Sequence, residues 1–206
     1  MNEEVSLIRE DIEWVSINIQ EDAQNLTSPR VLLVGDSIVV GHCPLLRKKL
    51  EGRLALDFFA TSKIVCDKDY WEELHVVLVK RKYDMIIFNN GLHGLKVEDH
   101  VYAVGLERVL IKLKSFAVHI AWRNNTPCFY TEAKPENPWV MRSPKRNTIA
   151  LEIANKLHIP VIDAFSVLSD KKQYCADGVH YNNEGYAYLV DNEAEYIKNA
   201  INGVLL

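Results

Sequence analysis

Short apolar runs alternate along the chain with longer stretches whose apolar residues recur at helical spacing. The apolar runs predict strands at residues 31–34, 54–59, 84–88, 127–131 and 159–162. The other stretches predict helices at residues 44–50, 71–80, 98–120, 144–157 and 184–201. Strands that alternate with helices in this way are typical of a parallel sheet covered on both faces. We therefore predict an α/β fold, a three-layer α/β/α sandwich around a five-stranded parallel sheet.

Residues 3–24 do not follow this alternation. Their apolar residues are mixed with many acids, a pattern that fits a helix passing into an extended arm. A short polar connection, Asn25 to Arg30, separates this segment from the first predicted strand. We therefore predict an N-terminal arm, residues 1–29, that packs on the sheet, and a single domain formed by residues 30–206.

The composition limits the classes of partner. The chain has 206 residues, of which 48% are apolar and 25% charged, and its net charge is -4. This is typical of an ordinary soluble protein and gives no electrostatic reason to expect a nucleic-acid partner. No stretch approaches the roughly 20 apolar residues that span a bilayer. The start, Met1-Asn2-Glu3-Glu4, lacks the basic region of a secretory signal. We expect no membrane partner and a cytoplasmic location, although an N-terminus cut after a signal would look the same.

The cysteines and histidines give no indication of a metal site. The four cysteines, Cys43, Cys66, Cys128 and Cys175, form no C-x-x-C pair and are predicted to be buried free thiols. None of the seven histidines shows the spacing of known zinc-ligand pairs. We therefore expect no metal and no cofactor.

The apolar run Val31 to Val34 is followed directly by Gly35-Asp36-Ser37. Four apolar residues without a charge predict a central strand buried on both faces. Gly35 allows the backbone to turn sharply, so Ser37 would lie at the carboxyl end of the sheet, where open α/β sheets bind their ligands. Ser37 is therefore the candidate nucleophile. Asp36 beside it is either an acceptor that holds this turn or a contact to the substrate.

A serine nucleophile needs a base, and the base needs a group that orients it. Asp177-Gly178-Val179-His180, near the other end of the chain, supplies both. At this spacing one turn can bring the carboxylate to one ring nitrogen of His180 and leave the other nitrogen for the proton of Ser37. The alternative interpretation is a capped helix start with a solvated histidine.

Together, Gly35-Asp36-Ser37 after a strand and Asp177-x-x-His180 near the C-terminus resemble the SGNH or GDSL hydrolase family. The resemblance covers about residues 30–200. It implies a flavodoxin-like sandwich and a serine esterase whose catalytic residues are Ser37, Asp177 and His180. The pattern differs from the elbow of the α/β-hydrolases, because the second glycine is missing from Gly35-Asp36-Ser37-Ile38-Val39.

Two further family blocks, which complete the oxyanion hole together with the Ser37 N–H, are altered in this sequence. The family has a backbone N–H after the second strand, usually from a glycine; here the candidates are Ser62 and Lys63. It has an asparagine side chain after the third strand, and aligning Gly91 with the glycine of that block puts His93 in its place. A neutral histidine can donate one hydrogen bond from its ring. The alternative donors are Asn90 and Asn89. A third interpretation is that this segment is a purely structural Asn-Gly turn without a donor.

The predicted loop after the fourth strand carries candidate substrate contacts. Trp139 and Arg142 would lie at the same edge of the sheet as Ser37, and a tryptophan beside an arginine suits a sugar ring or a carboxylate. Alternatively, Trp139 packs the loop and the basic side chains are solvated. We expect His42 to be either an exposed surface residue or a residue that lines the pocket.

These observations predict hydrolysis of a small acyl ester, with O-acetyl groups on a carbohydrate as the favoured substrate and a small-molecule or glycan ester as the partner. The alternative is a non-catalytic sandwich that binds a glycan or acyl group, which the two altered oxyanion blocks favour. A phosphate-binding function is excluded because the first loop has no glycine-rich cradle and carries a carboxylate instead. The oligomeric state is left open.

Overall fold

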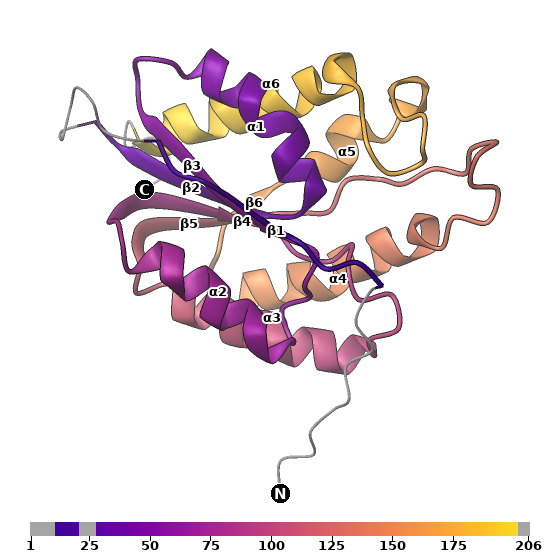
Figure 1. The fold of residues 1–206 in the computed structure, drawn as a ribbon, viewed down its shortest axis with the longest axis horizontal. Helices are drawn as coiled ribbons and strands as arrows, with labels where there is room; N and C mark the ends of the chain where they lie inside the picture. The colour runs from indigo at the N-terminus through magenta and orange to yellow at the C-terminus, as the bar shows by residue number, and fades with distance from the viewer. Residues whose placement is uncertain (1–10, 21–27, 202–206) are drawn as a thin grey trace, which may run out of the picture.

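The computed structural model describes residues 11–20 and 28–201 and shows a three-layer α/β/α sandwich (Figure 1). The central sheet has the strand order β1-β3-β2-β4-β5-β6. Its strands are β1 (Val15–Asn18), β2 (Arg30–Gly35), β3 (Ala55–Thr61), β4 (Tyr83–Phe88), β5 (Ala117–Arg123) and β6 (Val161–Ile162). The helices are α1 (Ser37–Lys49), α2 (Lys68–Leu78), α3 (Asp99–Leu113), α4 (Trp139–Lys156), α5 (Ala164–Leu168) and α6 (Asn183–Ile201). In Figure 1, α1, α5 and α6 cover one face of the sheet, and α2, α3 and α4 cover the other.

The strand β2 is central, as its apolar run predicts. It pairs in parallel with β3 on one side and with β4 on the other. Val31, Leu32, Leu33 and Val34 are each at most 1% exposed. Successive side chains of a strand point to opposite faces, so Leu32 and Val34 pack under α2 and α3 while Val31 and Leu33 pack under α1 and α6. The strand therefore ends, at Gly35, in the middle of the carboxyl edge of the sheet.

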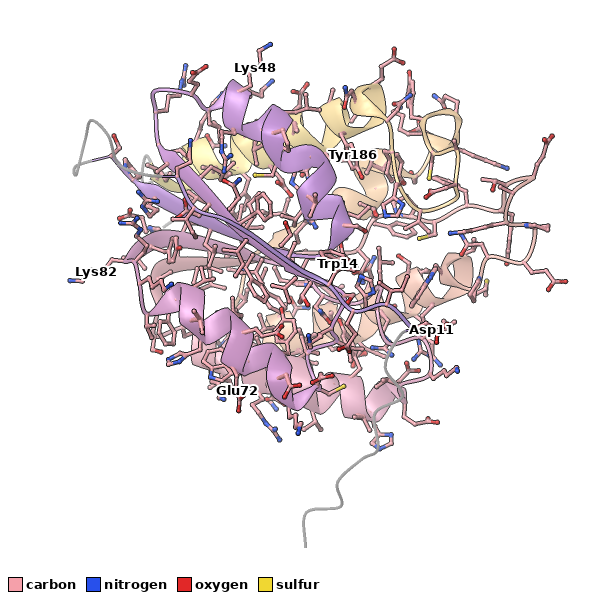
Figure 2. All side chains as sticks on the ribbon, in the orientation of Figure 1. Asp11, Trp14, Lys48, Glu72, Lys82 and Tyr186 are labelled. Atoms are coloured by element: carbon pink, nitrogen blue, oxygen red, sulfur yellow. The ribbon has the colours of Figure 1, made fainter. Side chains whose placement is uncertain are left out.

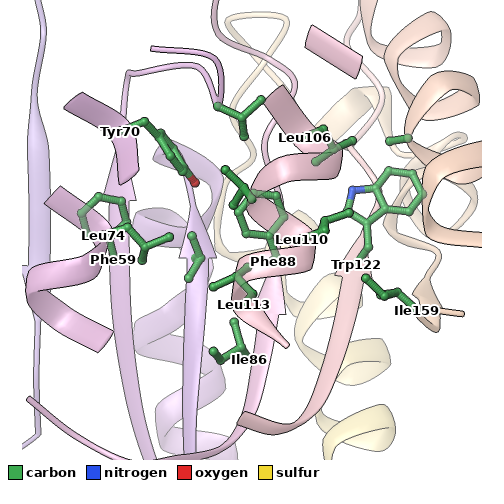
Figure 3. Close-up of a cluster of buried hydrophobic side chains, with 14 of the residues drawn as sticks. Phe59, Tyr70, Leu74, Ile86, Phe88, Leu106, Leu110, Leu113, Trp122 and Ile159 are labelled. Atoms are coloured by element: carbon green, nitrogen blue, oxygen red, sulfur yellow. The ribbon is translucent and has the colours of Figure 1, made fainter. Parts of the chain in front are cut away.

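The larger core cluster fills the layer between the sheet and α2, α3 and α4. Figure 3 shows its aromatic side chains, which come from β3, β4, β5 and α2 and include Phe59, Tyr70, Phe88 and Trp122. All four are at most 1% exposed. Burial of this apolar surface is the main force that holds the helices on the sheet.

The sheet has six strands rather than the five predicted, and the extra strand is antiparallel. This strand, β1, lies within the segment 3–24 and pairs with β3 in the register Val15 opposite Thr61. The helix expected in that segment falls partly on residues 1–10, which lie outside the described residues. The division of the chain into an arm and a domain stays a prediction.

The fourth parallel strand was predicted at the wrong place. It is β5, at Ala117–Arg123, and not residues 127–131. The apolar residues up to Ile120 keep a helical spacing, but α3 already ends at Leu113 and pairing with β4 draws the following residues into the sheet. The helices α1 and α4 also begin earlier than predicted, at Ser37 and Trp139.

Candidate active site

The structure brings Ser37, His180 and Asp177 together from opposite ends of the chain. Ser37 Oγ lies 2.7 Å from His180 Nε2, and His180 Nδ1 lies 2.6 Å from Asp177 Oδ2. A carboxylate can only accept, so Nδ1 carries the proton and donates to Asp177. Nε2 is then left to accept from the hydroxyl of Ser37. This is the geometry of a nucleophile, its general base and the group that orients the base.

The turn between β2 and α1 places Ser37. Ser37 is the first residue of α1, and Asp36 is its N-cap, with Oδ1 accepting from Ile38 N at 2.9 Å. A Cβ on Gly35 would lie 2.6 Å from Val39, so only glycine fits this close turn. The Asp36 side chain is buried, and its oxygen serves the helix cap rather than pointing to a substrate, the other role considered for it.

The loop after the short helical turn Lys172–Tyr174 places His180, the candidate base. Asp177 Oδ1 accepts from the backbone N–H groups of Val179 and His180, at 2.9 and 2.7 Å. Gly178 adopts a φ of 83°, in the left-handed region, and its carbonyl accepts from Phe129 N at 2.9 Å. These bonds fix the carboxylate and the imidazole in one rigid turn.

The same bonds set the charge of Asp177. Partial burial alone would raise the pKa of its carboxyl group, but the hydrogen bonds from the His180 ring, the His180 N–H and the Val179 N–H lower that pKa to about 2. The carboxylate is therefore charged at neutral pH. It can stabilise the positive imidazolium that forms when His180 takes a proton.

The four cysteines offer no alternative to Ser37 as the candidate nucleophile. All four cysteines are free thiols, and three are buried while Cys66 is half-buried. Burial raises the pKa of each thiol, to about 11 for Cys66 and Cys175 and about 12 for Cys43 and Cys128. The thiolate is the reactive form, so these side chains are inert at neutral pH.

The backbone donors predicted after the second parallel strand already have acceptors. Ser62 N donates to the carbonyl of Trp14 at 3.1 Å, and Lys63 N donates to Thr61 Oγ1 at 3.2 Å. Both residues are buried. The structure therefore commits these two N–H groups to internal hydrogen bonds, and neither is placed to receive a negatively charged oxygen.

The side chains of Asn89 and Asn90 are also engaged inside the protein. Asn89 Nδ2 donates to the carbonyl of Arg123 and to Asn125 Oδ1, which uses both of its amide hydrogens. Asn90 Nδ2 donates to the carbonyl of Lys63 at 3.0 Å, and its Oδ1 accepts from Val65 N. Both asparagines are at most 2% exposed. They hold the loops after β3 and β4 rather than pointing to the surface.

His93, in contrast, is half-buried. Its neighbour Leu92 packs in the same cluster as Ile38 and Val179, which flank Ser37 and His180. The imidazole of His93 meets the indole of Trp14 edge-on, with the ring centroids 6.1 Å apart. Among the side chains considered as oxyanion donors, His93 is the one that is not fully buried, and its role stays a prediction.

Of the two substrate contacts predicted after the fourth strand, Trp139 and Arg142, the second is engaged elsewhere. Its guanidinium forms an ion pair with Asp99 and donates to the carbonyl of Val97, which joins α4 to α3. Trp139 opens α4, is half-buried, and packs on the cluster that contains Val179. Trp139 therefore remains a candidate wall of the site on the side of His180.

The structure also shows a buried polar network that the sequence did not predict. His42 is fully buried, so both expectations for it, a surface residue or a pocket residue, are wrong. Its Nε2 lies 2.8 Å from Glu193 Oε2, and Arg123 Nη1 lies 3.0 Å from Glu193 Oε1. His42 Nδ1 bonds the carbonyl of Ile38 at 2.6 Å, in the first turn of α1. No short-range pattern links residues so far apart in the chain.

In the described part of the chain, residues 11–20 and 28–201, no group of three or more His, Cys, Asp or Glu side chains is arranged to hold a metal ion. No helix in these ranges is both long and apolar enough to cross a membrane.

The fold is shared with solved structures of ester hydrolases. An acetyl xylan esterase aligns with a TM-score of 0.68 and 16% identity, over 82% of this chain and 99% of its own. An acetylxylan esterase from Geobacillus stearothermophilus aligns with a TM-score of 0.63 and 15% identity, over 82% and 94%. A lipase/acylhydrolase from Enterococcus faecalis aligns with a TM-score of 0.66 and 18% identity, over 84% and 96%.

The comparisons by sequence find no match, in contrast to the comparison by structure. No family model matches the chain, and no curated protein matches it with a significant score. At identities of 15–18%, the structural likeness concerns the arrangement of sheet and helices. The chain therefore has the α/β/α sandwich fold that its resemblance to the SGNH hydrolases implied.

Proposed function

We propose that the protein is a serine hydrolase that removes short acyl groups, in particular acetyl groups, from a carbohydrate ester. The observation that carries the proposal is the continuous hydrogen-bond chain from Ser37 Oγ through the ring of His180 to Asp177, at 2.7 and 2.6 Å. Such a chain at the carboxyl end of a parallel sheet is the arrangement that acyl transfer needs.

In the proposed reaction, Ser37 Oγ attacks the ester carbonyl while its proton passes to His180 Nε2. The tetrahedral intermediate then collapses, and His180 gives that proton to the departing alcohol oxygen. Water attacks the acyl-enzyme by the same route, releasing the acid and restoring Ser37. Asp177 keeps the imidazole oriented and stabilises its positive charge in both halves of the cycle.

The negative oxygen of the intermediate needs donors. The N–H of Ser37 belongs to the first turn of α1, where backbone N–H groups have no partner within the helix and the helix dipole is positive. His93 is the proposed side-chain donor, in place of the family's asparagine. The internal bonds of Ser62, Asn89 and Asn90 support this assignment.

Two observations support a carbohydrate acetyl ester as the substrate class. Solved structures with this fold include acetyl xylan esterases. The side chains of His180 and Asp177 are 46% and 47% exposed, so the leaving-group side of the site is open to solvent and can accommodate a bulky alcohol such as a sugar. The half-buried Trp139 on that side suits contact with a sugar ring.

The test is acetate release from acetylated xylooligosaccharides and from p-nitrophenyl acetate. We expect turnover by the natural protein and a loss of about 10³-fold or more in Ser37→Ala. The matched control is Ser115→Ala, since the Ser115 hydroxyl is exposed and bonds only locally to the carbonyl of Lys112. A fluorophosphonate probe should label Ser37 in the control but not in Ser37→Ala.

A protein that neither turns over any ester nor reacts with the probe would contradict the proposal. Retained binding of the same oligosaccharides would then support the alternative, a non-catalytic domain that binds a glycan. The same protein samples therefore distinguish a hydrolase from a non-catalytic glycan-binding domain.

A further inference from the structure

The strand β1 brings a tryptophan to the edge of the sheet where the nucleophile lies. The register places Gly35 of β2 opposite Ala60 of β3, and Val15 of β1 opposite Thr61. Trp14, one residue before Val15, is therefore level with Ser62, which lies two residues beyond the Ala60 that pairs with Gly35. Figure 2 labels Trp14 at the end of the sheet from which α1 begins.

The backbone of Trp14 is fixed at this position by three hydrogen bonds. Its carbonyl accepts from Ser62 N at 3.1 Å and from Thr61 Oγ1 at 3.0 Å, and its own N–H donates to Ser62 Oγ at 3.0 Å. None of these bonds involves the indole. The side chain is thus held in place by the main chain, and it can be changed without removing the pairing of β1 with β3.

The contact between Trp14 and His93 spans the ends of β3 and β2. Trp14 directly precedes β1 and His93 follows β4, and both β3 and β2 stand between β1 and β4 in the sheet. Neighbouring strands are roughly 4.8 Å apart, so two side chains whose ring centroids are only 6.1 Å apart must lean toward each other beyond the ends of the two intervening strands. One of these strands, β2, is the strand that leads into Gly35-Asp36-Ser37.

The base approaches Ser37 from the other flank. The loop that carries His180 is tied to the chain after β5, through the bond from Phe129 N to the Gly178 carbonyl and the bond from Tyr181 Oη to the Pro127 carbonyl. His180 must protonate the leaving alcohol, so the alcohol departs on the β5 side of Ser37. The acyl group then points to the opposite side, toward β3 and Trp14.

We propose that Trp14 is a specificity-determining residue, whose indole together with His93 closes the acyl side of the site and restricts the acyl group to acetyl. This inference rests on the proposed function and adds the residue that limits the acyl chain. In this proposal the indole, which contacts the imidazole edge-on, obstructs an acyl chain longer than acetyl.

The test compares kcat/KM for p-nitrophenyl acetate, butyrate and octanoate in the natural protein, Trp14→Ala and Trp14→Phe. We expect the ratio of butyrate to acetate activity to rise about tenfold or more in Trp14→Ala, since each added methylene in an apolar site changes kcat/KM by about that factor. Trp14→Phe should give an intermediate ratio and remains informative if the alanine variant folds poorly.

The chain offers a matched control at a distance from the site. Trp71 on α2 also contacts a histidine, His75, with ring centroids 5.8 Å apart, although these two rings are stacked rather than edge-on. Trp71→Ala removes a tryptophan from another pair with a histidine and should leave the ratio unchanged. If both Trp14 variants hydrolyse p-nitrophenyl acetate but keep the butyrate-to-acetate ratio of the natural protein, the role of Trp14 is overturned and the proposed function is not. No reaction of the natural protein with any ester would overturn the proposed function and this role with it.

Discussion

His42 on α1 and Glu193 on α6 form an ion pair in the interior, with 2.8 Å between ring Nε2 and carboxylate Oε2 and neither side chain exposed. Arg123 of β5 pairs with the other oxygen of the same carboxylate. Burial opposes the charged form of Glu193, but His42 and Arg123 hold its pKa below the ordinary value. The network joins α1 and α6 to β5 of the sheet, and His42 also bonds the carbonyl of Ile38 in the first turn of α1.

Glu193→Gln should therefore destabilise the protein strongly. The variant leaves His42 and Arg123 without their counter-charge, and removing one partner of a buried pair costs about 3–5 kcal/mol. Urea unfolding measures the loss. The control is Lys49→Ala, which removes an exposed pair with Asp191 on the same two helices and should cost less than about 1 kcal/mol. Equal losses in the two variants would contradict the importance of the network.

His93→Ala should lower kcat on p-nitrophenyl acetate by about 10²–10³-fold with little change in KM. This is the typical effect of removing one oxyanion donor, which acts on the transition state and not on the bound substrate. His93→Asn, which restores a side-chain donor, should recover part of the loss. His100→Ala serves as the control because His100 is exposed on α3. A small effect of His93→Ala would contradict the role of His93 as the side-chain donor to the oxyanion.

Asp177 should make stability depend on pH at the acidic end. Its pKa is about 2 in the folded protein and 3.8 in the reference state, so the folded state favours the carboxylate. The resulting stability is fully present above about pH 4 and is lost as the pH falls toward 2. Unfolding of the natural protein and of Asp177→Asn, measured between pH 2 and pH 6, checks this. The difference between them should shrink below pH 4; a constant difference would be inconsistent with the lowered pKa.

Gly178→Ala should impair both stability and turnover. Gly178 has a φ of 83°, and a Cβ there would lie 2.6 Å from the Phe129 carbonyl, in the turn that carries Asp177 and His180. Gly52→Ala is the matched control, because Gly52 has a φ of 73° but nothing within 4 Å of the added atom. Both variants should lose about 1 kcal/mol or more from backbone strain. Only Gly178→Ala should lose activity, as measured with p-nitrophenyl acetate.

The sequence predicts the parts of this molecule that depend on local pattern. The four apolar residues before Gly35 predict the central strand, and the spacing of Asp177 and His180 predicts the turn that joins their side chains. The strand β5 was misplaced because its apolar residues continue the helical spacing of α3, and pairing with β4 decides the outcome. Local propensity is a weak guide where tertiary pairing overrides it.

The environment of the site depends on contacts that no short-range pattern contains. The sequence offers Ser62 as a backbone donor, but its N–H donates to the carbonyl of Trp14, 48 residues earlier. His42 lies 151 residues from Glu193 in the chain. Such pairings follow from how the sheet and helices come together.

The bond between Ser37 and His180 joins residues 143 positions apart. Contacts between such distant parts of a chain carry a large cost in loop entropy and form late in folding. Ser37 should therefore not react with a fluorophosphonate probe in a partly refolded chain, and should react only after α6 has packed on the sheet. The rate at which labelling recovers after dilution from urea would thus measure the rate of the last step of folding.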